Sequence, residues 1–155
     1  MSEITEGVFM DIKSNLKEIE KKIGYAFKDK SLLIQAFTRT SYCNEKNFGN
    51  RDNLSSNEVL EFFGDSVLSA AIVSMLMRDR TKRYEHGILA ELDEGELSII
   101  KSGLSDKKNL SRSIAALGLE KYLLLGEGDE KLDIRHEPSV MEDLFESIIG
   151  AVYID

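Results

Sequence analysis

The stretch from Asn57 to Leu68 reads NEVLEFFGDSVL, and its spacing of acids guides the interpretation of the whole chain. In an α-helix, Glu58, Glu61 and Asp65 fall within about 60° of one another, because each residue turns the helix by about 100°. No Lys or Arg stands four residues on to relieve the repulsion among these carboxylates. The opposite side of the predicted helix carries an apolar stripe that we expect to face the core: Leu60, Phe63, Val67 and Ala71.

A second acidic helix is predicted late in the sequence. Asp143 and Glu146 are three residues apart, with Ser147 and Gly150 beside them on the helical wheel. Glycine inside a helix costs roughly 1 kcal/mol relative to alanine, so Gly150 indicates the close approach of another backbone or of a ligand. A third acidic segment, residues 93–96, opens another predicted helix, where a capping role is the stronger interpretation.

The two acidic helices predict a site for a divalent cation. A solvated acidic face is the ordinary interpretation, but the apolar Phe62 and Ile72 flank the acids of the first helix. Carboxylates that face one another raise each other's pKa, and a hard cation removes that repulsion. Carboxylate ligands without nearby cysteine or histidine favour Mg²⁺ or Mn²⁺ over zinc, and the Glu-x-x-His pairs of a di-iron site are missing. His86 and His136 lack a metal-ligand spacing, which indicates surface positions.

The composition indicates a single all-α domain. The 155 residues suffice for one core, and a lone proline among periodic apolar segments favours helix over strand. A net charge of −8 argues against a nucleic-acid binder, unless bound metal carries positive charge to the phosphates. The lone cysteine, Cys43, excludes an internal disulfide, and no segment resembles a signal peptide or approaches the ~20 apolar residues of a membrane span. We therefore expect a cytoplasmic protein that enters no membrane.

Periodicity and stop signals place the remaining elements. Helices are predicted at about 11–23, 30–37, 97–104, 110–117 and 138–155, with a further short one at 119–125. Another helix is predicted to open at Ser55, Ser56 or Asn57, all good N-caps, and to continue to about Met77. A polar loop is expected at 44–56, a charged connection at 79–87 and a glycine-rich turn at 126–130. The last helix opens at Pro138 and meets no stop signal by Asp155. We therefore expect the natural chain to continue past this residue.

Four blocks of this sequence, taken in order, resemble the catalytic domain of the ribonuclease III family. NEVLEFFGDSVL looks like the signature motif of that family. The other blocks are TRTSY at 38–42, EGELS at 94–98 and DLFESIIGA at 143–151. The resemblance covers about residues 15–155. It implies one homodimeric, all-α catalytic domain over 1–155, without the double-stranded RNA-binding domain that follows it in many relatives.

The resemblance also implies roles for six acids. Four match the metal-binding carboxylates of the family, namely Glu61, Asp65, Asp143 and Glu146, of which Asp65 and Glu146 are expected to be essential for catalysis. Two others, Glu58 and Glu94, match acids that support the site or contact RNA. The family often has histidine where this chain has Arg39, so the role of that loop stays open.

The implied activity is hydrolysis of double-stranded RNA by a metal-activated water, with Mg²⁺ as cofactor and Mn²⁺ able to replace it. The products would carry 5′ phosphates and 3′ hydroxyls, with two-nucleotide 3′ overhangs that require two sites in a homodimer. Phe62, on the outward side of the signature helix, is the expected interface anchor; packing against the final helix of its own chain is the alternative. Basic residues within 78–83 and 101–112 are either RNA contacts or solvated helix ends.

Two other functions stay open. An all-α nucleoside triphosphate pyrophosphohydrolase also uses Glu-x-x-Glu helices with Mg²⁺, but its motifs lie closer in sequence than Glu61 and Asp143. A non-catalytic RNA-binding version of the fold would have lost acids that this chain keeps. Turnover of free nucleotides against cleavage of duplex RNA distinguishes the enzymes.

Overall fold

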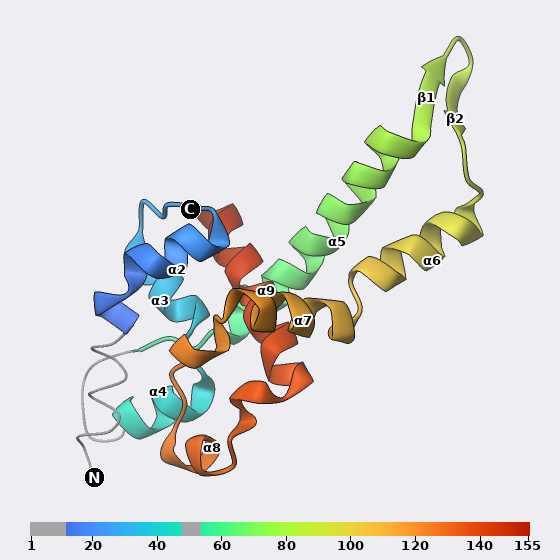
Figure 1. The fold of residues 1–155 in the computed structure, drawn as a ribbon. Coiled ribbons are helices and arrows are strands. Elements are labelled where there is room, and N and C mark those ends of the chain that lie inside the picture. The colour runs from blue at the N-terminus through green and yellow to red at the C-terminus, as the bar shows by residue number, and fades with distance from the viewer. Residues whose placement is uncertain (1–11, 48–53) are drawn as a thin grey trace.

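The structure is a computed structural model that describes residues 12–47 and 54–155, and these are mostly helical (Figure 1). The helices are α2 (Leu16–Ile23), α3 (Lys30–Ala36), α4 (Thr40–Asn47), α5 (Glu58–Arg80), α6 (Glu94–Leu104), α7 (Lys107–Leu117), α8 (Glu127–Lys131) and α9 (Pro138–Ile154). Short 3₁₀ turns cover Glu120–Tyr122 and Ile134–His136. Strands β1 (Thr81–Tyr84) and β2 (Gly87–Ala90) form an antiparallel hairpin. The all-α prediction is confirmed for everything described except this hairpin.

The centre of the fold is the crossing of α5 and α9, which pack along each other, while α9 also contacts α7 and α3. Two glycines let the helices meet backbone to backbone. A Cβ added to Gly64 would lie 1.8 Å from the carbonyl oxygen of Glu146, and one added to Gly150 would lie 2.2 Å from that of Leu60. The expectation that Gly150 marks a close backbone approach is confirmed. The crossing fixes the acidic turns of α5 and α9 beside each other.

Around this crossing, the body of the protein buries a continuous apolar core. Ile19 of α2, Leu33 of α3, Ile114 of α7 and Leu144 of α9 are almost completely buried. Fully burying a side chain of this size contributes about 1.5–3 kcal/mol. In contrast, the far half of α5, the hairpin and α6 project away from the body as an arm (Figure 1). The arm, residues 69–104, exposes every residue of β2.

The inward stripe predicted for α5 is only partly right. Leu60 is buried, and Phe63 and Val67 are half-buried, but Ala71 is exposed. Ile72, which was placed on the acidic face, is 93% buried, with a relative exposure of 7%. The wheel assumed that the apolar side chains of α5 point inward, whereas the closest packing is through the small Gly64.

Three local predictions were wrong. The charged connection at 79–87 lies largely in the hairpin, whose Glu85–His86 loop lacks the Asn-Gly or Asp-Gly signal of two-residue turns. Helix α4 extends into the expected polar loop; its apolar residues show almost no helical periodicity, although Tyr42 and Cys43 are buried. Helix α8 occupies the expected glycine-rich turn. The rest of the predicted loop, 48–53, lies outside the described residues, as does the start of the first predicted helix.

Several helix ends match their predicted signals. Gly24 and Gly118 end α2 and α7 in left-handed conformation. Asp93 and Glu96 form a capping box at the start of α6, as the capping interpretation requires. Asn57 occupies the cap position of α5, but its side chain makes no capping hydrogen bond. Its amide is therefore not used to begin the helix.

Helix α9 runs to Ile154, and the backbone N–H of Asp155 still donates to the carbonyl of Ala151 at 3.1 Å, so no stop signal precedes the last residue of the sequence. The Asp155 carboxylate accepts hydrogen bonds from the backbone N–H groups of Asp29 at 2.7 Å and Lys28 at 2.8 Å. These two bonds are the main reason why the pKa of Asp155 lies below its ordinary value. They fasten the end of α9 to the loop between α2 and α3.

Helix α5 is also long and apolar enough, by composition, to cross a membrane, with a mean hydropathy of 1.7 over an 18-residue window. The expectation that no segment approaches such a composition was wrong on this point. Core helices pass the same test, and α5 packs along α9 in this fold. Its composition is therefore weak evidence for a membrane span.

Candidate active site

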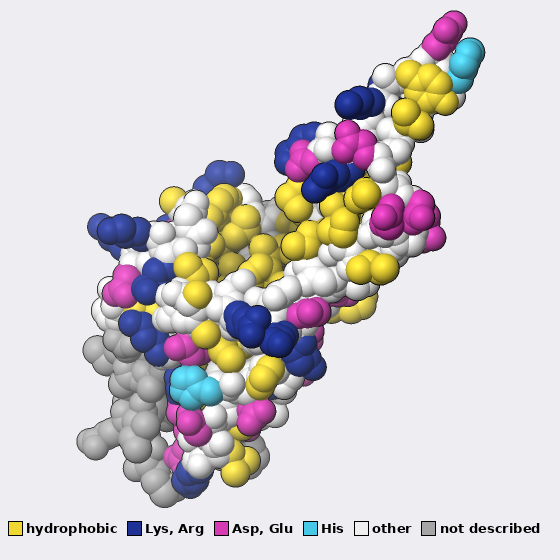
Figure 2. Space-filling view, turned by 45° about the vertical axis from the view of Figure 1, so that its right-hand side comes forward, with side chains coloured by type: hydrophobic (Ala, Val, Ile, Leu, Met, Phe, Trp, Pro, Cys, Tyr) yellow, Lys and Arg dark blue, Asp and Glu magenta, His cyan; other side chains and the backbone are white. Residues whose placement is uncertain are grey.

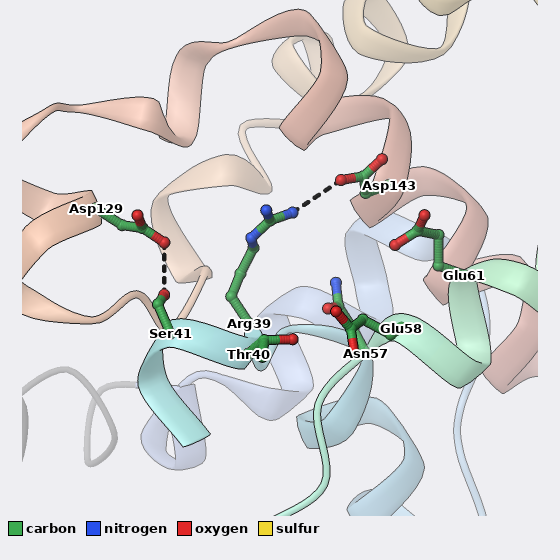
Figure 3. A pocket seen from close by; sticks show the side chains of 8 residues that line it. All are labelled: Arg39, Thr40, Ser41, Asn57, Glu58, Glu61, Asp129 and Asp143. Atoms are coloured by element: carbon green, nitrogen blue, oxygen red, sulfur yellow. Dashed lines mark hydrogen bonds and ion pairs between the residues drawn. The ribbon is translucent and has the colours of Figure 1, made fainter. Parts of the chain in front are cut away.

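A polar pocket opens where α5, α9 and the start of α4 meet (Figure 3). Its volume is about 430 Å³. Three of the predicted acids line it: Glu58 and Glu61 from the first turn of α5, and Asp143 from α9. The other lining residues are Arg39, Thr40, Ser41, Asn57 and Asp129. The structure thus brings residues from both predicted acidic helices to one concave surface.

The carboxyl group of Glu61 is partly buried and has more negative than positive charges around it. Burial raises its pKa above the ordinary value, and the negative charges of Asp143, Glu58 and Glu142 raise it further. The positive charge of Arg39 acts in the opposite direction. Acids outnumber cations in this site, so it gains stability from a further cation that enters it.

Asp65 and Glu146 lie outside the lining of this pocket, one helical turn further along the crossing. Burial is the largest cause that raises the pKa of Glu146, to about 7, and Asp65 is the next. Glu142, Glu61 and Asp143 contribute in the same direction. The negative charges of acids on both helices therefore act on Glu146. The four predicted metal-binding carboxylates lie close enough to influence one another.

The donor chemistry of this group fits a hard divalent cation, because all four side chains offer carboxylate oxygens. Burial first, and neighbouring acids second, raise the pKa of Glu146 and of Glu61, and a bound cation would act against both causes. Among the described residues, however, no three acidic, histidine or cysteine side chains already surround one point closely enough to hold a metal. The four acids are gathered but not preassembled.

Arg39 explains part of that arrangement. Its Nη1 donates to Oδ2 of Asp143 at 2.8 Å, and the two side chains are about a quarter exposed. One of the predicted metal ligands is thus engaged by an arginine of the same chain (Figure 3). The role of the loop around Arg39, which the sequence left open, begins with this ion pair.

Glu94 lies in a different place from the other predicted site residues. It is on the arm, at a groove between α5 and α6, with Val73, Met77 and Leu97 among its neighbours. Its Oε1 accepts a hydrogen bond from Ser98 at 3.0 Å. Within one protomer, Glu94 does not line the acidic pocket, and its supporting role stays a prediction.

Phe62 lies on the outer side of α5 and is 80% exposed. It therefore does not pack against α9 of its own chain, and that alternative was wrong. Figure 2 shows further apolar side chains gathered along the arm and in the hollow where the arm leaves the body. The exposed apolar residues of the arm are Val73, Met75, Met77, Tyr84, Ile88, Leu89, Ile99 and Leu104.

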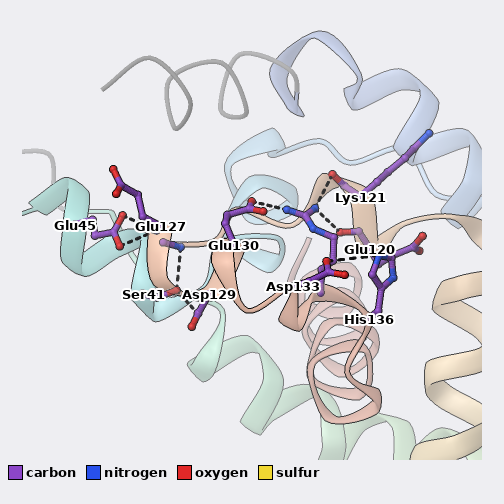
Figure 4. A network of polar contacts seen from close by, with 11 residues as sticks. Ser41, Glu45, Glu120, Lys121, Glu127, Asp129, Glu130, Asp133 and His136 are labelled. Atoms are coloured by element: carbon purple, nitrogen blue, oxygen red, sulfur yellow. Dashed lines mark hydrogen bonds and ion pairs between the residues drawn. The ribbon is translucent and has the colours of Figure 1, made fainter. Parts of the chain in front are cut away.

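Sequence reasoning missed the outer wall of the pocket, where α4 meets α8 (Figure 4). Ser41 donates to the Asp129 carboxylate and accepts from the backbone N–H of Gly126 at 3.1 Å. Glu45 accepts from the backbone N–H of Glu127 at 2.8 Å. Neither helix was predicted, so no spacing pattern in the sequence revealed this wall.

The charged side chains around the site are partly committed to ion pairs. Lys107 lies 3.1 Å from Glu142, and Arg78 is 2.8 Å from Asp79. His86 and His136 are exposed, as expected from their sequence context. These basic side chains remain half or more exposed, so their contact with RNA stays a prediction.

The fold and the site together define a helical domain with a carboxylate-rich pocket at a two-helix crossing. The chain matches the Ribonuclease-III-like family over residues 29–155. It belongs to the ribonuclease III family, as its sequence blocks predicted.

Individual relatives agree with this assignment. The chain is 42% identical over 137 residues to ribonuclease 3 of Treponema succinifaciens, covering 88% of this chain and 36% of the relative. It is 44% identical over 137 residues to ribonuclease 3 of Protochlamydia amoebophila, covering 88% of this chain and 51% of the relative. The chain thus spans about a third to a half of the length of these relatives.

A solved structure shares the fold. The nuclease domain of ribonuclease III from Campylobacter jejuni superposes with a TM-score of 0.73 at 30% identity, covering 90% of this chain and 85% of that domain. That protein has structural flexibility in a region involved in dimer formation. The helical fold predicted from the sequence is therefore confirmed.

Proposed function

We propose that the protein is a ribonuclease III that hydrolyses phosphodiesters of double-stranded RNA with Mg²⁺, which Mn²⁺ can replace. The observation that carries this function is the meeting of acids from α5 and α9 in one pocket at the helix crossing, with Asp65 and Glu146 one turn further along. Membership of the ribonuclease III family agrees with it. We also propose that the protein acts in the cytoplasm.

The acids of the site have two different roles in this proposal. Glu61, Asp65, Asp143 and Glu146 would hold the cation, and Glu58 at the mouth of the pocket supports them. A bound divalent cation would lower the pKa of the attacking water and stabilise charge on the leaving 3′ oxygen. The short distance between the two helices at Gly64 keeps the acids from moving apart. Products would then carry 5′ phosphates and 3′ hydroxyls.

Two-nucleotide overhangs need two such sites at a fixed separation, and we propose that a homodimer supplies them. The 80% exposure of Phe62 beside the acidic face supports an interface on α5. Recognition of the duplex would rest on shape and backbone, because A-form RNA presents a major groove that side chains cannot read.

The family assignment leaves the pyrophosphohydrolase alternative without support. The four acids argue against a non-catalytic version, because all of them are present and near one another. No observation in the structure favours either alternative over RNA cleavage.

The decisive experiment replaces Glu146 by Gln, which keeps the size of the side chain and removes its charge. We expect cleavage of a duplex RNA in Mg²⁺ to fall by several orders of magnitude, because a metal ligand is lost. Folding, followed by circular dichroism, should persist. Glu142→Gln is the matched control on the same helix; it removes an acid paired with Lys107 and should keep most of the activity. Cleavage at the wild-type rate by the Glu146 variant would refute the proposed site.

A further inference from the structure

The acidic pocket contains its own cation, Arg39. Its guanidinium lies 2.8 Å from Asp143 and lowers the pKa of Glu61, while every other charged group named around Glu61 raises it. The lining residues that the structure describes include no second lysine or arginine. In the metal-free protein, Arg39 thus supplies positive charge that the gathered acids need.

The main chain at Arg39 is fixed, so only the side chain is free to change partner. Its backbone N–H donates to Leu124 at 3.1 Å, and its carbonyl accepts from Cys43 at 3.1 Å at the start of α4. Arginine side chains are long and flexible, and the pocket into which this one projects is open and polar. A move away from Asp143 requires no rearrangement of the fold.

A second observation on the same wall indicates a ligand. Asn57 is 98% buried, with a relative exposure of 2%, and lines the pocket. Its Nδ2 has no hydrogen-bond acceptor within the described part of the chain. An unsatisfied buried donor destabilises the fold, and the side chain does not cap α5. Figure 3 shows this amide on the side of the pocket from which Arg39 extends.

We propose that Arg39 is a resident counter-ion that a divalent cation displaces from Asp143, and that the freed guanidinium then binds an RNA phosphate together with Asn57. This inference rests on the proposed function. A cation that ligates the Asp143 carboxylate repels the guanidinium 2.8 Å away and neutralises the charge that holds it, so the two compete. After the exchange, the guanidinium and the Asn57 amide are two donors without acceptors on one wall. Phosphate oxygens are the acceptors that such donors bind best.

The exchange is tested by the melting temperature of Arg39→Gln, with and without Mn²⁺. In EDTA the variant should melt below wild type, because the acids lose their only nearby lining cation. At saturating Mn²⁺ this difference should disappear or reverse, since the metal replaces the lost charge and binds about tenfold more tightly without a competitor. Arg39→Lys keeps the charge and should restore most of the stability in EDTA.

Arg135→Gln is the matched control. Arg135 pairs with Glu130 at similar exposure, in the turn after α8 and away from the acids of α5 and α9. Its loss of melting temperature should be equal in EDTA and in Mn²⁺. If Arg39→Gln behaves like this control while Mn²⁺ stabilises wild type, the counter-ion exchange is refuted and the metal site stands. If Mn²⁺ stabilises neither protein, the metal site itself fails, and this inference fails with it.

The second part of the proposal is that Arg39 and Asn57 bind an RNA phosphate. It is tested by measuring the binding of a duplex RNA in Ca²⁺ by fluorescence anisotropy. Asn57→Leu removes an unsatisfied donor at similar size, so its melting temperature should equal or exceed that of wild type. Its RNA affinity, like that of Arg39→Gln, should fall about tenfold. Wild-type affinity in both variants would refute the phosphate site, whatever the metal measurements show.

Discussion

The two halves of α5 differ in how they are packed. Near its start, Gly64 brings the backbone of α5 against that of α9, with no side chain between them. Further along, α5 continues into an arm where several large apolar side chains remain exposed, such as Val73 at 41%, although Ile72 and Leu76 are buried. The first half achieves fixed geometry through contact within the chain, which positions the acids. The second half offers a surface that only another molecule can cover.

The largest effect should come from the crossing itself. Replacing Gly64 by Ala puts a Cβ 1.8 Å from the carbonyl oxygen of Glu146, and the neighbouring atoms are backbone that cannot yield. Overpacking of this kind costs about 3 kcal/mol or more, so we expect the variant to unfold or to lose its cooperative melt in urea denaturation.

Gly103→Ala, on the arm, is the matched control. A Cβ there meets nothing within 4 Å, and alanine favours the helix by up to about 1 kcal/mol. The contrast between the close-packed crossing and the open arm breaks down if the two glycine variants have equal stability.

The next effect concerns the outer side of the first half of α5, which faces away from α9. Replacing Phe62 by Ala should weaken the proposed dimer by about thirtyfold, because an aromatic interface anchor contributes about 2 kcal/mol. The helical circular dichroism spectrum should not change, since the side chain is 80% exposed. Sedimentation velocity measures the shift toward monomer. Leu132→Ala, equally exposed but in the turn after α8, should stay as dimeric as wild type.

The smallest effect is a dependence of stability on pH that arises at the crossing. Glu146 has its pKa raised from 4.5 to about 7 in the folded protein, and that of Glu61 is also raised. A carboxyl with a raised pKa binds its proton more tightly in the folded chain. The metal-free protein should therefore be most stable near pH 5 and lose roughly 1–2 kcal/mol as the pH rises to about 8.

Urea denaturation in EDTA at several pH values measures this slope. Glu146→Gln should flatten most of it, because the group that binds the proton is gone. The lowered pKa values of Glu20 and Asp29 act below pH 4.5 and do not contribute in this window. An unchanged slope in the Glu146 variant would place the dependence outside the crossing.

The sequence predicted the body of the fold because its signals are local. Gly24, Gly118 and Pro138 mark helix boundaries through backbone geometry alone, and the structure confirms all three. The four acids were found from helical spacing and the resemblance together. These acids lie near one another because α5 and α9 cross closely, and Gly150 had indicated such a close approach in the sequence.

What the sequence did not predict depends on tertiary contacts. Helix α4 has almost no periodic apolar face, and it is held by the burial of Tyr42 and Cys43 together with the Ser41 contact to α8. The pairing of Arg39 with Asp143 joins residues 104 apart in sequence. A helical spacing pattern in the sequence cannot reveal a pair so far apart along the chain. The hairpin was missed because its turn residues are not those that most hairpins use.

The central place of α9 also has a consequence for how the protein is made. Its Ser147 hydroxyl donates to the carbonyl of Ala36, a partner 111 residues earlier. During synthesis, α2, α3 and α5 leave the ribosome long before residues 138–154 exist to cover them. The apolar faces of these helices then have no native partner, and contacts of such long sequence separation form slowly. The nascent chain must therefore remain soluble in an incomplete state, and the folding of the whole body awaits the helix that carries two of its four acids.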